Sequence, residues 1–188
     1  YAAGETAGGP HGADRLGGNM LVTCQVFGER AGKDAASYIK DVIDENDQVL
    51  ENLAREEEIR LNSILGREGL ENPKDIKKDL QELMWSNYLV VKNEGSLQNI
   101  LHQLEQLLKR LNNANVKNYY DLRKYLELEN MIFLAKIITI AAKTRKESRG
   151  SHYRDDYGQE NPDFAQPIFI EYIDNDLKMT FRNFKGDI

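Results

Sequence analysis

The clearest hydrophobic pattern in the chain lies between residues 96 and 111, where leucine and isoleucine recur at steps of three and four residues. This spacing places the apolar side chains on one face of an α-helix. The segment therefore predicts an amphipathic helix that begins at Ser96, after a break at Glu94 and Gly95. Its apolar positions are Leu97, Ile100, Leu101, Leu104, Leu107, Leu108 and Leu111.

Two further helices are predicted on either side of this one. Asn72 followed by Pro73 is a typical helix start, and the helix after it is expected to reach about Val91. Its inward positions are Ile76, Leu80, Leu83, Met84 and Leu89. After an asparagine-rich connection, a long helix is predicted from Tyr120 to Ser148. It is apolar nearly all round between residues 131 and 142, so we expect it to be the central helix. Together the three helices predict an antiparallel, spectrin-repeat-like three-helix bundle.

The segment before the bundle is dense in acidic residues, with eight acids between Asp41 and Glu58. A broken apolar stripe continues to Leu65 and ends near Gly66 and Gly69. This combination is typical of a long helix with one solvated face.

The pattern changes from helical to alternating near the end of the chain. Residues 167–173 and 177–184 predict two strands, with Asp174, Asn175 and Asp176 as the turn between them. An isolated two-stranded hairpin is marginal in water. We therefore expect it to pack against the bundle.

The first 32 residues hold eight of the fourteen glycines. The apolar residues 1–3 are interpreted as the end of a buried strand, and a loop with little side-chain bulk follows them. Gly17 and Gly18 then precede Asn19, which is a favourable N-cap for a helix from Met20 to about Ile39. The amides at a helix start favour an electron-rich ligand oxygen or an anion. The segment therefore suggests a ligand site.

Composition narrows the classes of function. The net charge of -6 and a pI near 5.2 argue against a nucleic-acid-binding surface, which needs a basic stripe. A single cysteine, Cys24, excludes an intramolecular disulfide. No apolar run reaches 18 residues, so no membrane-spanning helix is predicted. We expect a cytoplasmic location, with any membrane contact made through partner subunits.

The sequence resembles a known flavoprotein family in three places. Residues 1–32 are similar to the flavin-contacting stretch near the end of the FAD domain in succinate dehydrogenase and fumarate reductase flavoprotein subunits. LQELMWSNYLVVKNEGSL is similar to a segment of their helical domain, and KESRGSHYRDDY resembles their ESRGxHxRxDY signature. L-aspartate oxidase carries a similar glycine-rich stretch. The resemblance implies the C-terminal part of a flavin-dependent oxidoreductase.

The resemblance also implies roles for individual residues. Glu5 would bind the adenosine ribose of FAD, which suits a carboxylate because it can accept two hydroxyl hydrogen bonds. Arg15 would bind a carboxylate of a dicarboxylic substrate through a bidentate fork. The backbone of Asn19, Met20 and Leu21 would approach the flavin pyrimidine ring and stabilise the reduced, anionic flavin.

Two residues of the same stretch leave alternatives open. The family usually has Asn where this chain has Asp14. The Asp14 carboxylate has three possible roles. It would hold Arg15 in place, compete with the substrate for Arg15, or be a simple surface residue. His11 is either a loop-packing imidazole or part of the site, and the sequence gives it no proton-transfer role.

Arg149, His152 and Arg154, followed by Asp155 and Asp156, form the densest group of chemically active side chains. A catalytic or metal site is one interpretation. Metal-ligand spacing is lacking, since one histidine beside adjacent aspartates does not define a coordination shell. We favour a structural interpretation, in which the cations cap a helix end and pair with acids.

These observations define the expected organisation. Residues 1–38 would belong to an FAD-binding α/β domain, residues 39–150 to the helical bundle, and residues 151–188 to a C-terminal loop and hairpin. Taken alone, the chain would hold no catalytic residue or metal site and would not retain FAD. The exposed apolar positions Leu21, Val22, Val26 and Phe27 would then favour self-association.

Three functions fit this organisation. The first is the interconversion of succinate and fumarate by the full-length flavoprotein. L-aspartate oxidation is the best rival, because Arg15 would bind a carboxylate in either case. In the third, the bundle and hairpin form a docking module for an electron-transfer partner such as an iron-sulfur subunit.

Overall fold

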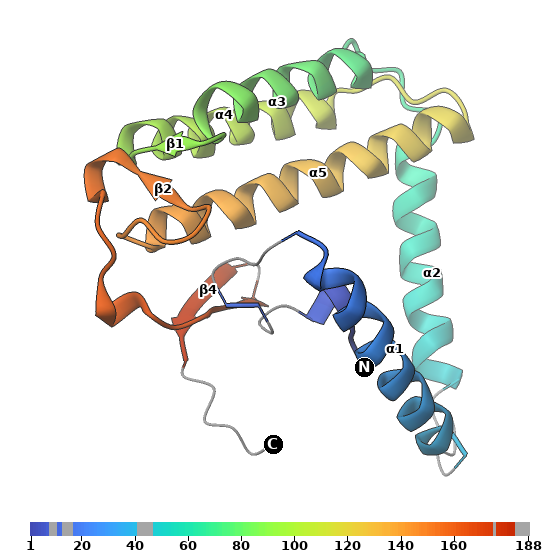
Figure 1. Ribbon diagram of the computed structural model, residues 1–188. Coiled ribbons are helices and arrows are strands. Elements are labelled where there is room, and N and C mark those ends of the chain that lie inside the picture. The colour runs from blue at the N-terminus through green and yellow to red at the C-terminus, as the bar shows by residue number, and fades with distance from the viewer. Residues whose placement is uncertain (8–10, 13–16, 41–46, 175, 183–188) are drawn as a thin grey trace. The chain divides into compact units, whose positions relative to one another are not determined.

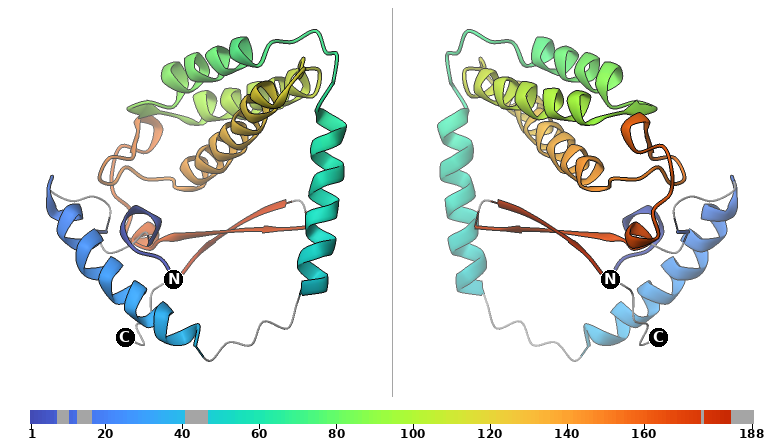
Figure 2. Two further views of the ribbon diagram at one scale, coloured as in Figure 1. Left: turned by 90° about the vertical axis from the view of Figure 1, so that its right-hand side faces the viewer. Right: turned by 90° about the vertical axis from the view of Figure 1, so that its left-hand side faces the viewer.

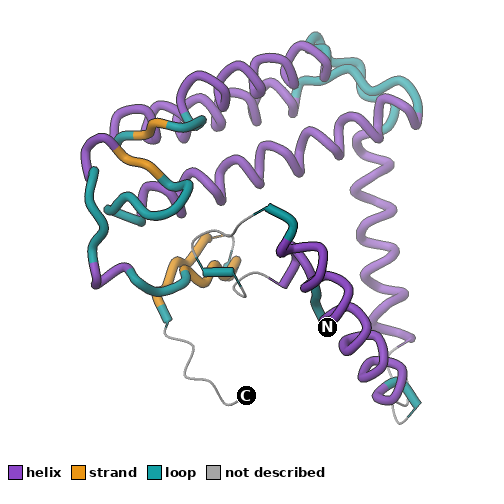
Figure 3. The backbone as a smooth tube through the Cα atoms, in the orientation of Figure 1, coloured by secondary structure: helices purple, strands orange, loops and turns teal. Residues whose placement is uncertain are grey.

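The computed structural model describes residues 1–7, 11–12, 17–40, 47–174 and 176–182. Contacts along the chain divide it into two compact units, residues Tyr1–Leu53 and Ala54–Ile188. The boundary between the units falls inside helix α2 (Asp47–Ile64). Figure 1 labels the elements, and Figure 3 distinguishes helices, strands and loops.

The first unit is built on helix α1 (Asn19–Tyr38) and a 3-10 turn, η1 (Gly4–Ala7), that packs on it. Gly4 has φ +72°, and a Cβ at this position would lie 2.9 Å from the Cys24 sulfur. Both the backbone conformation and the close approach therefore require glycine here. The Tyr1 hydroxyl donates to Asp34 Oδ2 over 2.7 Å, which extends this contact along α1.

Two predictions about this unit are wrong. Residues 1–3 are not the end of a strand, because the described part of the unit offers no strand to pair with and the chain enters η1 directly. Asn19 is the first helical residue rather than the N-cap, a position that Gly18 takes with φ +89°. Leu21, Val22, Val26 and Phe27 are 41–67% exposed within the unit, and self-association through them stays a prediction.

The second unit confirms the predicted bundle. Helices α3 (Pro73–Asn87), α4 (Glu94–Asn112) and α5 (Tyr119–Thr144) pack on one another. Figures 1 and 2 show successive helices running in opposite directions. The core is formed by the apolar faces that the periodicity predicts, with Ile76, Leu97, Ile100 and Leu111 fully buried.

The last turns of α2 also join this core. Ile64 is buried, and the Arg60 guanidinium pairs with Glu129 on α5 over 3.1 Å. The helix ends at Ile64, and Gly66 just after it has φ +85° and donates its amide hydrogen to the carbonyl of Val116 over 2.8 Å. The predicted helix end near Gly66 is confirmed, because glycine adopts this left-handed conformation without strain. Residues 41–46, the first part of the acidic segment, lie outside the described residues.

The connection between α3 and α4 differs from the prediction. Helix α3 ends at Asn87, and Val91–Lys92 form strand β1, which pairs in parallel with β2 (Tyr153–Arg154). Leu89 is consequently half exposed and does not face the core.

The predicted break between the helices, at Glu94 and Gly95, is instead the first turn of α4. Asn93 is the N-cap: its side chain accepts from the Ser96 amide over 2.9 Å, and its own amide donates to the Ser96 hydroxyl over 3.1 Å. This reciprocal pair satisfies two amides at the helix start, so Gly95 is tolerated in the first turn. Helix α5 likewise ends at Thr144 rather than Ser148.

The predicted C-terminal hairpin is confirmed. Strands β3 (Ile168–Ile173) and β4 (Asp176–Phe181) pair antiparallel, with Ile168 opposite Phe181. The second strand is shorter than predicted, and residues 183 and 184 lie outside the described part. The rings of Tyr172 and Phe133 meet edge to face with centroids 5.3 Å apart, which packs the hairpin against α5. Two short 3-10 turns, η2 (Asp155–Tyr157) and η3 (Pro162–Phe164), precede it.

None of the described helices is long and apolar enough to cross a membrane.

Val90 is a strained position that offers a direct test of this connection. It has φ +61° in a γ-turn closed by the Val91 amide, which donates to the Leu89 carbonyl over 3.0 Å. A β-branched residue in this region costs about 1–2 kcal/mol, and 71% of the Val90 side chain is exposed.

Replacing Val90 by glycine is therefore expected to raise the free energy of unfolding by about 0.5–1 kcal/mol, after the added flexibility of the unfolded chain is subtracted. Urea denaturation measures this change. The matched variant Val91→Gly should lower stability, because Val91 lies in β1 with ordinary strand geometry. A lower free energy of unfolding in Val90→Gly than in the unaltered chain would show that the Val90 backbone is not strained.

Candidate functional site

The proposed flavin-site residues fall on both described and undescribed parts of the first unit. Glu5 lies on η1 with an exposed side chain, and Asn19, Met20 and Leu21 form the first turn of α1. Arg15 lies outside the described residues, as does Asp14. The structure therefore bears on the glutamate and on the helix start, while the position of the arginine stays a prediction.

The glycine-rich loop is connected to this helix start by His11. The Thr23 hydroxyl donates to the Met20 carbonyl over 2.8 Å, so its oxygen accepts from the Nε2–H of His11 over 3.1 Å. The imidazole thereby joins residue 11 to the first turn of α1. This contact is consistent with the loop-packing interpretation of His11.

The start of α1 suits an electron-rich ligand. Its N-cap is Gly18, which has no side chain to accept the first-turn amides, and the positive end of the helix dipole lies here. The Leu21 amide already donates to the Gly18 carbonyl over 3.1 Å. The Leu21 amide is therefore less available to a bound ring. The exposed Glu5 carboxylate is an acceptor that fits the ribose hydroxyls of FAD. The uncapped helix start offers amide donors that fit the pyrimidine ring.

The second unit contains a buried ionic cluster around Arg154, whose side chain is 0% exposed. Its guanidinium donates to Asp156 at 2.6 and 2.9 Å and to Glu94 at 3.2 Å. It also donates to the carbonyls of Ala142 and Lys143, at 3.3 and 2.9 Å, which are among the last carbonyls of α5. Arg154 therefore caps the C-terminus of α5, as the structural interpretation predicts.

Asp156 completes a double cap at this end of the bundle. Its Oδ2 accepts from the Glu94 amide over 2.8 Å, at the positive end of α4. Hydrogen bonds from Arg154 lower the pKa of Asp156 below its usual value. Their effect on this pKa outweighs that of burial, which would raise it. One ion pair thus satisfies the negative end of α5 and the positive end of α4, which lie side by side because the helices are antiparallel.

A second ionic cluster centres on Glu147, which is also 0% exposed. Its carboxylate accepts from Arg145 at 2.6 Å, from Arg149 at 2.9 and 3.0 Å, and from the Asn161 amide at 2.8 Å. Burial alone would raise the pKa of Glu147. The hydrogen bonds from Arg149, Asn161 and Arg145 outweigh burial and lower that pKa to about 2.

Arg145 carries this cluster onward to the hairpin. It donates to the carbonyls of Phe164 and Gln166, at 2.6 and 2.7 Å, and lies over the ring of Phe181 on β4. The sequence interpretation missed Glu147 and Arg145. The available signal was an acid with an arginine two residues away on each side, in a segment that follows a helix.

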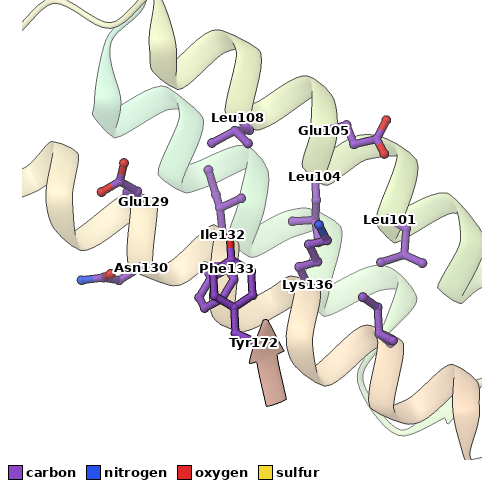
Figure 4. Close-up of a pocket in the computed structure, with 11 residues that line it drawn as sticks. Leu101, Leu104, Glu105, Leu108, Glu129, Asn130, Ile132, Phe133, Lys136 and Tyr172 are labelled. Carbon is purple, nitrogen blue, oxygen red and sulfur yellow. The ribbon is translucent and has the colours of Figure 1, made fainter. Parts of the chain in front are cut away.

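A groove of about 490 Å³ lies between α4, α5 and β3 (Figure 4). Leu104, Leu108, Ile132 and Phe133 form much of its apolar lining, and Tyr172 of the hairpin lies at its edge. It is a feature of the second unit alone. Its lining offers donors at Asn130, Lys136 and Tyr172, but it also carries the carboxylates of Glu105 and Glu129, which would repel a dicarboxylate.

Comparison with known proteins places these features in context. Residues 77–185 match the family described as fumarate reductase flavoprotein C-term. The chain is 38% identical over 174 residues to a subunit of the fumarate reductase (CoM/CoB) of Methanothermobacter marburgensis, covering 90% of this chain and 31% of that protein. It is 31% identical over 175 residues to the succinate dehydrogenase flavoprotein subunit of Bacillus subtilis, covering 87% and 29%.

Solved structures give the same picture. A quinol fumarate reductase from E. coli superimposes with a TM-score of 0.90 at 25% identity, covering 99% of this chain and 34% of that chain. The Mycobacterium smegmatis Sdh1 complex gives 0.82 at 27% identity, covering 100% and 33%. This chain therefore spans about a third of the length of the relatives it matches.

Proposed function

Because the chain belongs to the family of fumarate reductase and succinate dehydrogenase flavoprotein subunits, we propose that it is the C-terminal part of an FAD-dependent oxidoreductase interconverting fumarate and succinate. The observation that carries this proposal is the family match over residues 77–185, in a chain that begins with the glycine-rich helix start described above. When bound, FAD would supply the two-electron chemistry by exchanging hydride with a substrate carbon.

The residues of the first unit would bind and orient. Arg15 would hold one carboxylate of the substrate through its two parallel N–H donors. Glu5 would accept hydrogen bonds from the ribose hydroxyls. The backbone of Asn19, Met20 and Leu21 would approach the pyrimidine ring and stabilise negative charge on it.

The second unit would provide rigidity and a docking surface rather than chemistry. Arg149, Arg154 and Asp156, from its densest group of chemically active side chains, are engaged in the ionic clusters of Arg154 and Glu147, which support structure. Several relatives are named as subunits, which supports a partner subunit, and we propose an iron-sulfur protein for electron transfer as that partner. We propose a cytoplasmic protein that is peripheral to a membrane through such partners. The domain organisation 1–38, 39–150 and 151–188 belongs to the same proposal.

The test uses the full-length flavoprotein that contains this chain, purified with FAD and then reduced. Fumarate should reoxidise the flavin, as followed by its absorbance. Replacing Arg15 by alanine should slow this step by about 10- to 150-fold, the value of a lost charge-assisted hydrogen bond of 1.5–3 kcal/mol, while FAD stays bound.

The matched control is Arg30→Ala, since Arg30 is an exposed arginine on α1. It should reoxidise like the unaltered protein. If fumarate fails to reoxidise the unaltered flavoprotein, the dicarboxylate assignment is wrong, and reduction by L-aspartate is then the test of the rival activity. Loss of FAD in Arg15→Ala would instead assign Arg15 to the cofactor.

A further inference from the structure

Two adjacent tyrosines at the start of α5 have largely exposed side chains. Tyr119 is 78% exposed and Tyr120 is 59% exposed. Both lie in the second unit, at the end of the bundle where α3 also starts (Figure 1). Tyrosine is common at the centres of protein interfaces, because its ring supplies contact area and its hydroxyl can remain hydrated. This end of the bundle is therefore a candidate interaction surface.

Basic side chains from both helices surround Tyr120. The Lys124 ammonium lies 3.6 Å from the centroid of the Tyr120 ring, and the Arg123 guanidinium lies 5.7 Å from it. Both distances are typical of cation–π contacts. A hydrogen bond from Lys124 is the largest cause that lowers the pKa of the Tyr120 hydroxyl. The charges of Lys124, Lys74 and Arg123 lower this pKa further, while desolvation opposes them. Because Lys74 lies in the first turn of α3, cations of two helices face one ring.

Three lysines of this surface lack a carboxylate partner among the described residues. No ion pair within that part of the chain joins a carboxylate to the ammonium group of Lys74, Lys117 or Lys124. Arg123, in contrast, pairs with Glu127 over 3.3 Å. The chain as a whole has a net charge of -6. The unpaired cations are therefore a local feature of this end of the bundle.

The acids in the first turns of these two helices are matched to the helices themselves. Asp75 lies at the positive end of α3, and Asp121 lies at the positive end of α5. Asp121 also accepts from the Lys117 amide over 3.2 Å. An acid in a first turn offsets the positive end of the helix dipole. The charges of the lysine ammonium groups are therefore left for another molecule.

We propose that the tyrosine–lysine surface, formed by Lys74, Lys117, Tyr119, Tyr120 and Lys124, docks an acidic segment of a partner protein. Carboxylates of that segment would pair with the three ammonium groups, and an apolar side chain between them would cover the Tyr120 ring. This inference stands independently of the proposed oxidoreductase function.

The lysines and the aromatic rings together favour a protein over other anions. A small anion would use the ammonium groups and leave both tyrosine rings exposed. A nucleic acid would be repelled by the rest of the chain, whose net charge is -6. An acidic protein segment carries carboxylates and apolar side chains side by side, so it complements both features of the surface.

The test uses the full-length flavoprotein that contains this chain, with a fluorescein-labelled peptide of repeating Glu-Glu-Leu as the probe. Fluorescence anisotropy measures the dissociation constant of the peptide at low and at physiological ionic strength. We expect saturable binding that weakens as the salt concentration rises, since exposed charges are screened. A Gln-Gln-Leu peptide of the same length should not bind, because it has no carboxylates.

The variant Lys124→Glu should weaken binding of the acidic peptide about tenfold, because an attraction is lost and a repulsion of similar size replaces it. Lys136→Glu is the matched control, since Lys136 is an exposed lysine of α5 that lines the groove instead. It should bind the peptide like the unaltered protein. Tyr120→Ala should weaken binding several-fold, whereas Tyr120→Phe keeps the ring and should retain binding.

Several results would overturn the docking surface. They are absence of binding to the acidic peptide, equal weakening in Lys124→Glu and Lys136→Glu, and unchanged binding in Tyr120→Ala. A single-stranded DNA oligonucleotide is measured in parallel. If it binds more tightly than the peptide and loses affinity in Lys124→Glu, the surface recognises polyanions in general, and the proposal of a protein partner is wrong.

Discussion

Replacing Arg154 by methionine is expected to lower the free energy of unfolding by about 3–5 kcal/mol, because the buried guanidinium donates hydrogen bonds to two carboxylates and two carbonyls. Methionine fills much of the same space, so the loss reflects charge and hydrogen bonding rather than a cavity. The variant would leave the partly exposed carboxylates of Asp156 and Glu94 close together without the cation that they share. It would also remove the donors to the last carbonyls of α5.

Urea denaturation followed by circular dichroism measures this effect. Arg123→Met is the matched control, because Arg123 pairs with Glu127 on the exposed surface of α5 and should contribute less than about 1 kcal/mol. Equal stability of the two variants would mean that the double cap does not hold the helix ends together.

Replacing Glu147 by glutamine is expected to cost about 3 kcal/mol at pH 7, the second-largest effect. The amide keeps the shape of the side chain, but it cannot compensate the charges of Arg145 and Arg149. The loss should centre on the hairpin, because Arg145 connects Glu147 to Phe164, Gln166 and Phe181. Hydrogen exchange of β3 and β4 should therefore accelerate more than that of α4.

The same residue predicts how stability depends on acid. The folded pKa of Glu147 is about 2, below the ordinary value of 4.5, so its contribution is fully present above pH 4.5 and is lost as the pH falls towards 2. Unfolding curves between pH 5 and 2.5 should show a steeper loss for the unaltered chain than for Glu147→Gln. The control Glu160→Gln should retain the steep loss, because Glu160 is an exposed partner of Arg149. Parallel curves for all three proteins would contradict the assignment.

Sequence patterns predicted an element correctly where the residues that determine it are close together along the chain. The periodic leucines of α4, the Asn72–Pro73 start of α3 and the alternation in the hairpin all specify their elements through neighbours a few residues away. They failed at residues 88–96. There a strand partner 62 residues away, Tyr153, ends the helical run, and Asn93 provides a cap that outweighs the glycine after it.

The sequence by itself determined the three-helix bundle, the hairpin and the family, because each depends on residue patterns within one segment. It also identified Arg154 as a structural cation. Only the tertiary structure decided which groups that cation meets. It placed the end of α5 beside the start of α4 and joined Glu147 to the hairpin. The physical reason is that burial and charge pairing depend on groups brought together from distant parts of the chain, and no local pattern records those distances.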